Sequence, residues 1–376
     1  MKLAVLKERR AGEARVAATA ETVKKFTGLG LAVTVERGAG ERACISDDDY
    51  RAAGAAIAPD AADALADADI VLKVRGPEPS EIAAMKSGAV VIGLLAPYTE
   101  KDAIASLAAH GVSAFAMEFL PRISRAQSMD VLSSQANLAG YKAVIDAAAH
   151  FGRAMPMMMT AAGTIAPARV FIMGVGVAGL QAIATARRLG AIVSATDVRP
   201  ATKEQVESLG ASFVAVIDEE FRQAETAGGY AKEMSKEYQA KQAALVAETI
   251  RKQDIVITTA LIPGRKAPVL VTEEMVKTMK RGAIIVDLAV EQGGNCPLSK
   301  PDQIVDVYGV TIMGYTNLPA RLAVDSSNLY ARNLFNFVAL IVDRKTGALA
   351  LDWNDEIVRG AGLTRDGQIV HPALKG

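Results

Sequence analysis

The stretch ARVFIMGVGVAGLQAIATARRLGAIVSATDVR, residues 168–199, decides the fold of this chain. It opens with an apolar run, continues through three glycines at the spacing G-x-G-x-x-G into an Ala-rich helical pattern, and closes with a second apolar run that ends in an acid. This order is typical of a strand, a tight turn, a helix and a second, parallel strand. It therefore predicts the start of a dinucleotide-binding α/β domain.

The three glycines and the acid have separate expected roles. Gly174 permits the turn, Gly176 lets the backbone approach a pyrophosphate, and Gly179 allows close contact between helix and strand. The helix N-terminus attracts the phosphates. Asp197 can accept hydrogen bonds from both ribose hydroxyls and would repel a 2′-phosphate, so the pattern favours NAD(H) over NADP(H). Arg199 leaves the second nucleotide open, because a nearby arginine can accommodate that phosphate.

Apolar runs alternate with helical patterns on both sides of this stretch. We expect two series of strands, at Leu3–Leu6, Ala32–Glu36, Ile70–Lys73, Val90–Leu94 and Ser113–Met117, and at Val170–Met173, Ile192–Thr196, Ser212–Val216, Ile255–Thr259, Ile284–Leu288 and Thr311–Gly314. Alternating strands and helices indicate a parallel sheet with helices on both faces. The sequence therefore predicts an α/β protein with two Rossmann-like, doubly wound parallel-sheet domains, which also suits a length of 376 residues.

Two segments set the expected domain boundaries. Residues 129–151 read as one long helix, which can bridge domains, and the run Met157–Met159 after it reads as loop and packing. The tail from residue 347 contains an Asp366–Gly367 turn, a plausible hairpin, and is expected to complete the first domain. We therefore expect a first domain of residues 1–132 with 320–376, and an NAD(H)-binding domain of residues 133–319.

Composition argues against several classes of protein. Lys+Arg and Asp+Glu number 42 each, and no basic stripe with interleaved aromatics argues for a nucleic-acid partner. No apolar window reaches the roughly 18 residues of a membrane span, and the charged N-terminus is not a signal peptide. The distant Cys44 and Cys296 indicate a reducing compartment without a structural disulfide. The three histidines lie in no metal-binding pattern, so no metal is expected.

Three further segments are candidates for ligand contact. Thr258–Gly264 (TTALIPG) and Asp287–Asn295 (DLAVEQGGN) each follow a strand, where parallel sheets open onto their ligands, although ordinary loops would look alike. The segment PRISRAQSMDVLSSQ, residues 121–135, gathers side chains that could fix a carboxamide, with Arg122 and Asp130 orienting each other and a glutamine. Asp130 could equally be only the N-cap of the long helix.

A polar insertion and a missing group bear on the mechanism. Residues 221–247 carry a Gly228–Gly229 hinge and are either a surface helix or a lid. No nucleophile elbow or P-loop is present, and the first 109 residues contain no histidine that could exchange a proton beside a nicotinamide. The protein could therefore pass hydride without acid–base chemistry of its own.

Taken together, these segments resemble one family along essentially the whole chain. RISRAQSMD at 122–130, GGYAKEM at 228–234 and TTALIPG, with the glycine-rich stretch, resemble the NAD(H)-binding component (domain I, the alpha subunit) of the proton-translocating NAD(P) transhydrogenases. The resemblance implies that NADH bound here exchanges hydride directly with NADP⁺ on a partner component. A membrane component then couples this transfer to proton movement.

The resemblance also assigns site residues. It implies a loop that positions the nicotinamide, a mobile loop at about 221–240 that closes over the nucleotide, and further residues that line the NAD site. These are, in order, Arg122, Gln127, Asp130 and Ser133; Tyr230 with Gly229; and Val177, Asp197, Val198, Arg199, Thr259, Ala260 and Leu261, beside Gly174, Gly176 and Gly179. It further implies a homodimer, NADP-binding and membrane-spanning partners, and a cytoplasmic, peripheral place on the inner face of the membrane.

The related alanine dehydrogenases share the start KExxxGExRVA, here Lys7–Ala17, but the resemblance to them is incomplete. They carry a histidine shortly after the fourth strand and a lysine near the third. Here the fourth strand runs into GLLAP without a histidine, while Lys73 and Arg75 remain and Arg15 is kept. An alanine dehydrogenase-like enzyme and an NAD-sensing module without catalysis are the alternatives. The chain ends at Gly376 without membrane helices, as separate subunits do, although a shortened chain would look the same.

Overall fold

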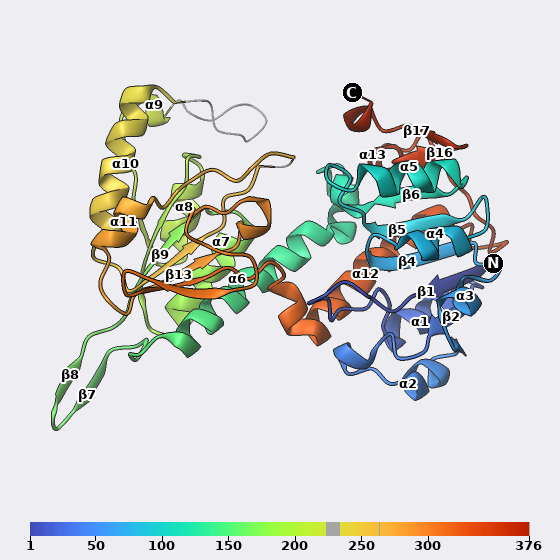
Figure 1. Ribbon diagram of the computed structural model, residues 1–376, viewed down its shortest axis with the longest axis horizontal. Helices are drawn as coiled ribbons and strands as arrows, with labels where there is room; N and C mark the ends of the chain where they lie inside the picture. Colours follow the sequence, from blue (N-terminus) through green and yellow to red (C-terminus); the bar gives the residue numbers. More distant parts are fainter. Residues whose placement is uncertain (223–233, 263, 376) are drawn as a thin grey trace. The chain divides into compact units, whose positions relative to one another are not determined.

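A computed structural model describes residues 1–222, 234–262 and 264–375. The chain divides into two compact units, residues 1–135 with 319–376, and residues 136–318. Sequence reasoning places the same two crossings near residues 132 and 320. Figure 1 labels the helices and strands of each unit.

The first unit is built on a six-stranded sheet in which all strands run parallel. In spatial order these are β3 (Ala56–Ala58), β2 (Ala32–Glu36), β1 (Lys2–Val5), β4 (Ile70–Arg75), β5 (Val90–Leu94) and β6 (Ser113–Ala116). This order, 3-2-1-4-5-6, is that of a doubly wound nucleotide-binding sheet. The edge strand β3 was not predicted, because three residues rich in alanine give almost no strand pattern.

Helices cover both faces of this sheet and enclose two apolar cores. Thr19 and Ser46 begin α1 and α2 with reciprocal capping hydrogen bonds. The helices are α1 (Ala20–Gly28), α2 (Asp47–Ala52), α3 (Ala61–Leu65), α4 (Pro79–Ala84), α5 (Lys101–Ala109), α12 (Ala323–Ile341) and α13 (Glu356–Ala361), with short 3-10 turns η1 (Glu41–Ala43), η2 (Met117–Phe119), η3 (Ser124–Met129), η5 (Pro319–Leu322) and η6 (Pro372–Leu374).

The C-terminal tail belongs to this first unit, as the sequence predicts. Leu363 donates its amide to the Ala114 carbonyl beside β6 (2.8 Å), and the Thr364 hydroxyl donates to the Val112 carbonyl. The hairpin of β16 (Thr364–Arg365) and β17 (Gln368–Ile369) turns at Asp366–Gly367, and both turn residues have positive φ. The predicted hairpin and the return of the chain to the first unit are therefore confirmed.

The second unit contains a seven-stranded sheet with the same central order. In spatial order its strands are β11 (Ser212–Phe213), β10 (Ile192–Thr196), β9 (Arg169–Met173), β12 (Ile255–Thr258), β13 (Ile284–Asp287), β15 (Val310–Met313) and β14 (Ile304–Val307). Six strands run parallel, and β14 pairs antiparallel at the edge. The six predicted strands are present, although β11 is only two residues long. The prediction of an α/β fold with two doubly wound parallel sheets is confirmed.

Helices also cover both faces of the second sheet. They are α6 (Val131–His150), α7 (Val177–Arg188), α8 (Thr202–Ser208), α9 (Glu219–Arg222), α10 (Lys236–Ile250) and α11 (Glu273–Thr278), with the turn η4 (Val290–Gln292). The predicted long helix is α6, which begins in the first unit and continues into the second. A Cβ at Gly140 of α6 would lie 2.0 Å from the Ala178 carbonyl, so α6 meets the start of α7 backbone to backbone.

The prediction for the methionine run Met157–Met159 was wrong. Met158 belongs to a hairpin of β7 (Met158–Thr160) and β8 (Gly163–Ile165), which projects from the rest of its unit (Figure 1). All three methionines are exposed, and Met159 is 78% exposed. Met was interpreted as filling gaps in a core, whereas these side chains cover nothing within their own unit.

Candidate functional site

The glycine-rich turn lies at the carboxyl edge of the second sheet. Gly174 follows β9 directly, with φ of 100°, and a Cβ there would meet the Thr259 hydroxyl at 2.6 Å. A Cβ at Gly179 would lie 2.0 Å from the Gly174 carbonyl, so α7 approaches the turn too closely for any side chain. These two contacts agree with the roles expected for the first and third glycines.

The middle glycine leaves an approach to the start of α7. A Cβ on Gly176 would meet no heavy atom within 4 Å, and Gly176 is the N-cap of α7 without a side-chain capping bond. The first amides of a helix lack partners within the helix and attract anions. The residues present therefore fit a pyrophosphate placed above Gly176.

Asp197, at the end of β10, is bonded both to the turn and to a neighbouring arginine. Its carboxylate accepts from the Val175 amide (2.7 Å) and the Arg199 amide (2.9 Å). The Arg199 guanidinium donates to both carboxylate oxygens at 2.9 Å, and the Asp197 side chain is only 6% exposed. Arg199 therefore compensates the charge of Asp197, and each carboxylate oxygen keeps accepting capacity for a ribose hydroxyl.

Two further strand ends are tied to the turn. The Thr259 hydroxyl donates to the Gly174 carbonyl (3.0 Å). The Ala260 amide donates to Asn295 Oδ1 (3.1 Å), and Asn295 Nδ2 donates back to the Ala260 carbonyl (2.9 Å). Buried Asp287 accepts the Asn295 amide (3.1 Å) and the Ala289 amide. The loops after β9, β12 and β13 thus form one hydrogen-bonded surface.

Sequence reasoning included Asn295 in a candidate loop but did not single it out. Its only signal is an asparagine directly after Gly293–Gly294, both of which have positive φ. Three apolar side chains predicted to line the nucleotide are unusually exposed: Val177 (39%), Val198 (59%) and Leu261 (47%). Exposed apolar side chains at the end of a parallel sheet are available to cover a flat ring.

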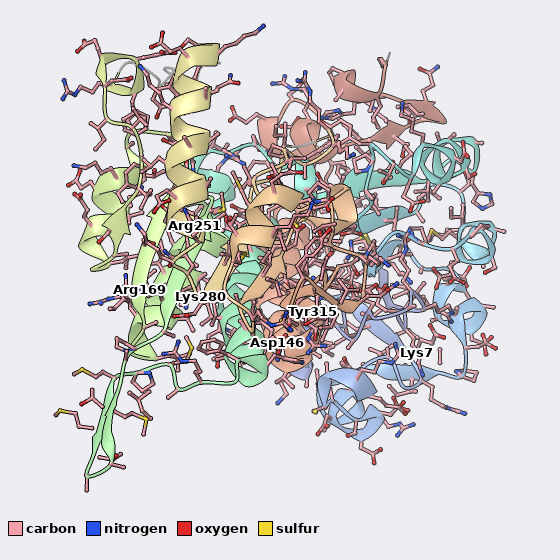
Figure 2. The ribbon with its side chains drawn as sticks, turned by 60° about the vertical axis from the view of Figure 1, so that its left-hand side comes forward. Lys7, Asp146, Arg169, Arg251, Lys280 and Tyr315 are labelled. Atoms are coloured by element: carbon pink, nitrogen blue, oxygen red, sulfur yellow. The ribbon has the colours of Figure 1, made fainter. Side chains whose placement is uncertain are left out.

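The opposite, amino edge of this sheet has a different character. Asp254 is buried there and accepts from the Arg169 amide (2.8 Å) and from Lys280 Nζ (2.8 Å) (Figure 2). Arg153 also donates to it, at 3.3 Å. These bonds close the edge with charges that belong to the protein itself, so the candidate site is the carboxyl edge.

In the first unit, the predicted loop Arg122–Ser133 precedes helix α6. Asp130 accepts the Ser133 amide (2.9 Å) and the Ser133 hydroxyl (2.5 Å), so Asp130 is the N-cap of α6. The mutual orientation of Arg122 and Asp130 expected from the sequence is wrong, since both Asp130 oxygens bind Ser133. The N-cap interpretation is confirmed.

Arg122 and Gln127 are the side chains that this loop displays. Both are exposed, and neither has a side-chain partner within the part of the chain that the structure describes. Arg125, between them, forms a two-point ion pair with Asp355 at 2.7 and 2.8 Å. The loop is thus held by its other members while these two polar side chains stay available for a ligand.

The predicted lid lies partly outside the described residues, which exclude Gly229 and Tyr230. On either side of that gap, Phe221 and Tyr238 stack with ring centroids 6.4 Å apart. Tyr238 is buried and donates to the Val216 carbonyl (3.1 Å). The two helices that flank the segment are therefore joined to each other at their bases.

Several charged groups of the first unit bind one another instead of a ligand. Arg15 is buried and donates to both oxygens of Glu13 at 2.6 and 2.7 Å. Lys73 Nζ lies 3.2 Å from Glu81 and 3.8 Å from Glu8. Burial raises the pKa of the Glu8 carboxyl to about 7, although Lys73 and two backbone amides act in the opposite direction. Lys73 and Arg15 are thus already matched by carboxylates.

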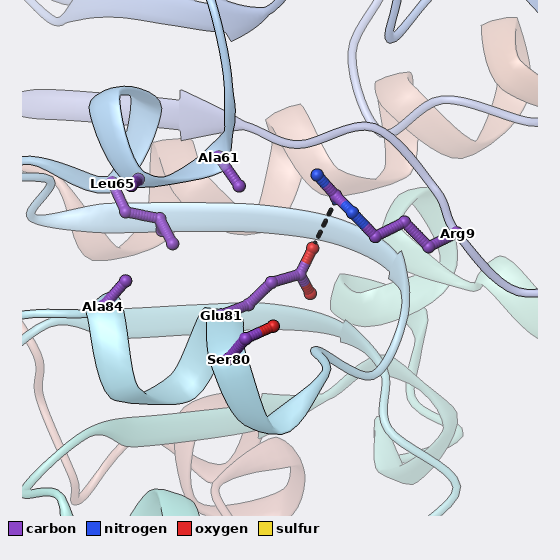
Figure 3. Close-up of a pocket in the computed structure, with 7 residues that line it drawn as sticks. Arg9, Ala61, Leu65, Ser80, Glu81 and Ala84 are labelled. Carbon is purple, nitrogen blue, oxygen red and sulfur yellow. Dashed lines mark hydrogen bonds and ion pairs between the residues drawn. The ribbon is translucent and has the colours of Figure 1, made fainter.

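A small pocket in the first unit is lined by Arg9, Ala61, Leu65, Ser80 and Glu81 (Figure 3). Arg9 Nη1 donates to Glu81 at 2.7 Å, and Arg9 also pairs with Glu36. Its charge is therefore used inside the protein, and the pocket shares no residue with the candidate site.

Cysteines, metals and membrane spans add little to the site. Cys44 and Cys296 are free thiols. Within the described ranges, no cluster of three or more His, Cys, Asp or Glu side chains is arranged to hold a metal ion. No helix among those residues combines the length and the apolar character needed to cross a bilayer.

A two-domain α/β protein with a glycine-rich turn at the switch point of its second sheet is the class that fold and site define. Family models named "Alanine dehydrogenase/PNT, N-terminal domain" and "Alanine dehydrogenase/PNT, C-terminal domain" match residues 4–139 and 143–372. The chain belongs to this alanine dehydrogenase/PNT family.

Known relatives place the chain more narrowly. It is 59% identical to an NAD(P) transhydrogenase subunit alpha of Rhodospirillum rubrum, over 100% of this chain and 99% of that protein. It is 48% identical to the protein of the same name from Rickettsia prowazekii, over 100% and 97%. An alanine dehydrogenase of Halomonas elongata is 30% identical over 100% and 96%. The resemblance to the transhydrogenase alpha subunit is confirmed, and the alanine dehydrogenases are distant relatives.

Solved structures agree. The transhydrogenase from Sinorhizobium meliloti is 55% identical, with a TM-score of 0.90, and covers 98% of this chain and 100% of that one. An L-alanine dehydrogenase is 25% identical, with a TM-score of 0.84, over 100% and 98%.

Proposed function

We propose that this chain binds NAD(H) on its second unit and is the NAD(H)-binding subunit of a transhydrogenase. In this proposal, hydride passes directly between the nicotinamide held here and the nicotinamide of NADP(H) on a partner component. The observation that carries it is the display of Arg122 and Gln127, which are exposed and without partners in the described chain, on an otherwise bonded loop. The similarity to transhydrogenase alpha subunits supports the same role.

Each group has a defined task in this proposal. The first amides of α7 above Gly176 bind the pyrophosphate, and Asp197 accepts the ribose hydroxyls. Gln127 offers a donor and an acceptor to the carboxamide, and Arg122 offers further donors. The bound nicotinamide supplies or receives the hydride.

The exchange needs no proton from the protein. A substrate alcohol or amine would require a base beside the nicotinamide. Lys73, the candidate for that role near the third strand, is buried against Glu81 and Glu8. Direct transfer between two nicotinamides is therefore the reaction that this set of residues serves best.

Partners complete the proposed function. We place the subunit on the cytoplasmic face of the membrane, held there by NADP-binding and membrane-spanning components that couple the transfer to proton movement. Gly229 and Tyr230 are assigned to a loop that closes over the nucleotide. A homodimer is part of the proposal, and the exposed side chains Met158, Met159 and Ile165 of the projecting hairpin offer an apolar surface for a second copy.

Reconstitution tests the proposal. The chain alone should bind NADH without oxidising it when pyruvate and ammonia are added. Mixed with an NADP-binding transhydrogenase component, it should transfer hydride between NADH and an NADP⁺ analogue at a measurable rate. The opposite result, no transfer in the mixture together with rapid oxidation of NADH by pyruvate and ammonia, would establish an alanine dehydrogenase instead. Binding without either activity would indicate an NAD sensor.

A further inference from the structure

One backbone carbonyl of the Arg122–Ser133 loop accepts hydrogen bonds from two asparagines of a distant helix. Asn333 Nδ2 donates to the Ser128 carbonyl at 2.8 Å, and Asn336 Nδ2 donates to the same oxygen at 2.9 Å. The donors lie three residues apart on α12, and hence on one face of that helix. Because a carbonyl oxygen has two lone pairs, both bonds can form at once. Ser128 directly follows Gln127.

The inner asparagine also reaches the start of helix α6. Asn333 is buried, and its Oδ1 accepts the Ser134 hydroxyl at 2.8 Å. Its amide thus joins the loop, through the Ser128 carbonyl, to the first turn of the helix that Asp130 caps. The two ends of the segment that carries Gln127 are fixed by one side chain.

A buried polar chain holds this junction from the other side. Gln135 Nε2 donates to the Ser134 hydroxyl (3.3 Å) and to the Ser326 carbonyl of α12 (3.2 Å). Arg15 Nη1 donates to Gln135 Oε1 at 2.8 Å, and Glu13 neutralises Arg15. This arrangement gives Arg15, retained from the start shared with alanine dehydrogenases, a place in the support of the loop.

We propose that Asn333 and Asn336 are positioning residues for hydride transfer, which set the place of Gln127 through the Ser128 carbonyl. The inference rests on the function proposed above, in which Gln127 orients the nicotinamide. Gln127 and Arg122 have no partner of their own in the described chain, so the loop backbone determines where they point. Two bonds on the neighbouring carbonyl remove much of the freedom that the backbone would otherwise keep.

The effect belongs to the transfer step and not to binding. The nucleotide turn and Asp197 lie in the second unit, whereas both asparagines and their acceptor lie in the first. Loss of the two donors should therefore slow transfer and spare NADH affinity, the signature of an interaction that acts at the transition state. A displacement of about 1 Å of a positioned group can cost roughly 100-fold in rate.

The variants remove the two donors with little change of shape. Asn333→Asp keeps the acceptor for Ser134 and loses the donor to Ser128, and Asn336→Ala loses the outer donor. Asn336→Gln keeps an amide and serves as the conservative variant. Arg332→Ala is the matched control, because Arg332 lies on the same helix and pairs with Glu21 on the exposed face (2.7 Å).

Single-turnover transfer with the NADP-binding component, NADH titration and thermal unfolding are measured for each protein. We expect the Asn333→Asp, Asn336→Ala pair to lower the transfer rate about 10- to 100-fold, and Asn336→Ala alone to lower it about threefold, with NADH affinity held within about twofold. Asn336→Gln and Arg332→Ala should match the wild type.

Three results would overturn the inference. The first is an unchanged transfer rate in the paired variant beside an active wild type. The second is an equal loss of rate and NADH affinity, which a merely structural role would give. The third is a wild type that binds NADH but transfers no hydride, which removes the proposed function itself. Asn336→Ala keeps the test decisive if the paired variant does not fold, since Asn336 is only half-buried.

Discussion

Asp197 divides its carboxylate between the protein and any nucleotide ribose that binds beside it. It accepts from the Val175 amide at 2.7 Å and is paired with Arg199. The ion pair changes the reason for preferring NAD(H). A lone carboxylate would repel a 2′-phosphate, whereas here the phosphate must also compete with Asp197 for the Arg199 guanidinium.

The nucleotide preference should depend on this charge. Asp197→Asn keeps the side-chain shape and leaves Arg199 without its counter-charge. Loss of a charged hydrogen bond costs about 1.5–3 kcal/mol, so NADH affinity should fall roughly 10- to 100-fold, while NADPH affinity should rise or hold. Titration of both nucleotides measures the ratio. Equal losses for both would mean that Asp197 acts only through the turn, and Arg199→Gln, which should weaken any gain in NADPH binding, is the matched control.

Glu8 is predicted to make stability depend on pH. Its pKa in the folded protein is about 7, against an ordinary value of 4.5, chiefly because of burial. The folded state therefore keeps its proton to higher pH than the unfolded chain does. This contribution is fully present below pH 4.5 and is lost as pH rises through 7, by at most about 3 kcal/mol. Glu8→Gln, which cannot ionise, should remove that slope.

Chemical unfolding of both proteins between pH 4.5 and 8 checks the Glu8 prediction. The difference in unfolding free energy between wild type and Glu8→Gln should change steadily across this window and level off above pH 7. Glu204→Gln, at an exposed position, should keep the wild-type slope. Parallel curves for wild type and Glu8→Gln would contradict the prediction.

At the scale of elements, strands with strong patterns were predictable and short ones were not. β9 and β13 are continuous apolar runs, which the sequence shows plainly. β14 escaped because it alternates across an exposed edge and turns at Tyr308–Gly309, where positive φ at tyrosine gives no sequence signal. Likewise, Gly174 and Gly179 have a recognisable spacing, whereas the clamp from Asn333 to Ser128 joins positions 205 residues apart. Contacts of that span follow from the fold and not from a local pattern.

The hairpin β7–β8 is predicted to hold two copies of the chain together. Met158 is 45% exposed and Met159 is 78% exposed, and neither contributes to a core of its unit. Replacing both with glutamate should convert a dimer to a monomer at micromolar concentration, because charge opposes burial in an apolar contact. Sedimentation measures the change, and the melting temperature should stay close to that of the wild type.

Ile304→Glu is the control for the hairpin variant. Ile304 is also exposed (42%) and also lies on a strand of the second unit, at the far edge strand β14. Its replacement should leave the oligomeric state unchanged. Dissociation in both variants would show a general effect of added negative charge, and a dimer that survives the methionine changes would place the interface elsewhere.

At the scale of the whole molecule, the two units differ in how the chain builds them. The first needs two separate segments, whereas the second is the continuous segment 136–318. Both apolar cores of the second unit draw only on residues of that segment. The turn at Gly174, Asp197 and the Asn295 clamp on Ala260 also lie within it. Folding and nucleotide binding should therefore be separable from hydride transfer.

Expression of residues 136–318 alone tests this separation. The fragment should unfold cooperatively and bind NADH within about tenfold of the full chain, because the residues proposed to hold the nucleotide are all present. It should transfer no hydride with an NADP-binding component, since Arg122 and Gln127 are missing. The same fragment with Gly179→Ala, where a Cβ would lie 2.0 Å from the Gly174 carbonyl, is the non-binding control. A folded fragment without NADH affinity would show that the first unit supplies part of the binding energy, and transfer by the fragment would remove the proposed role of the loop.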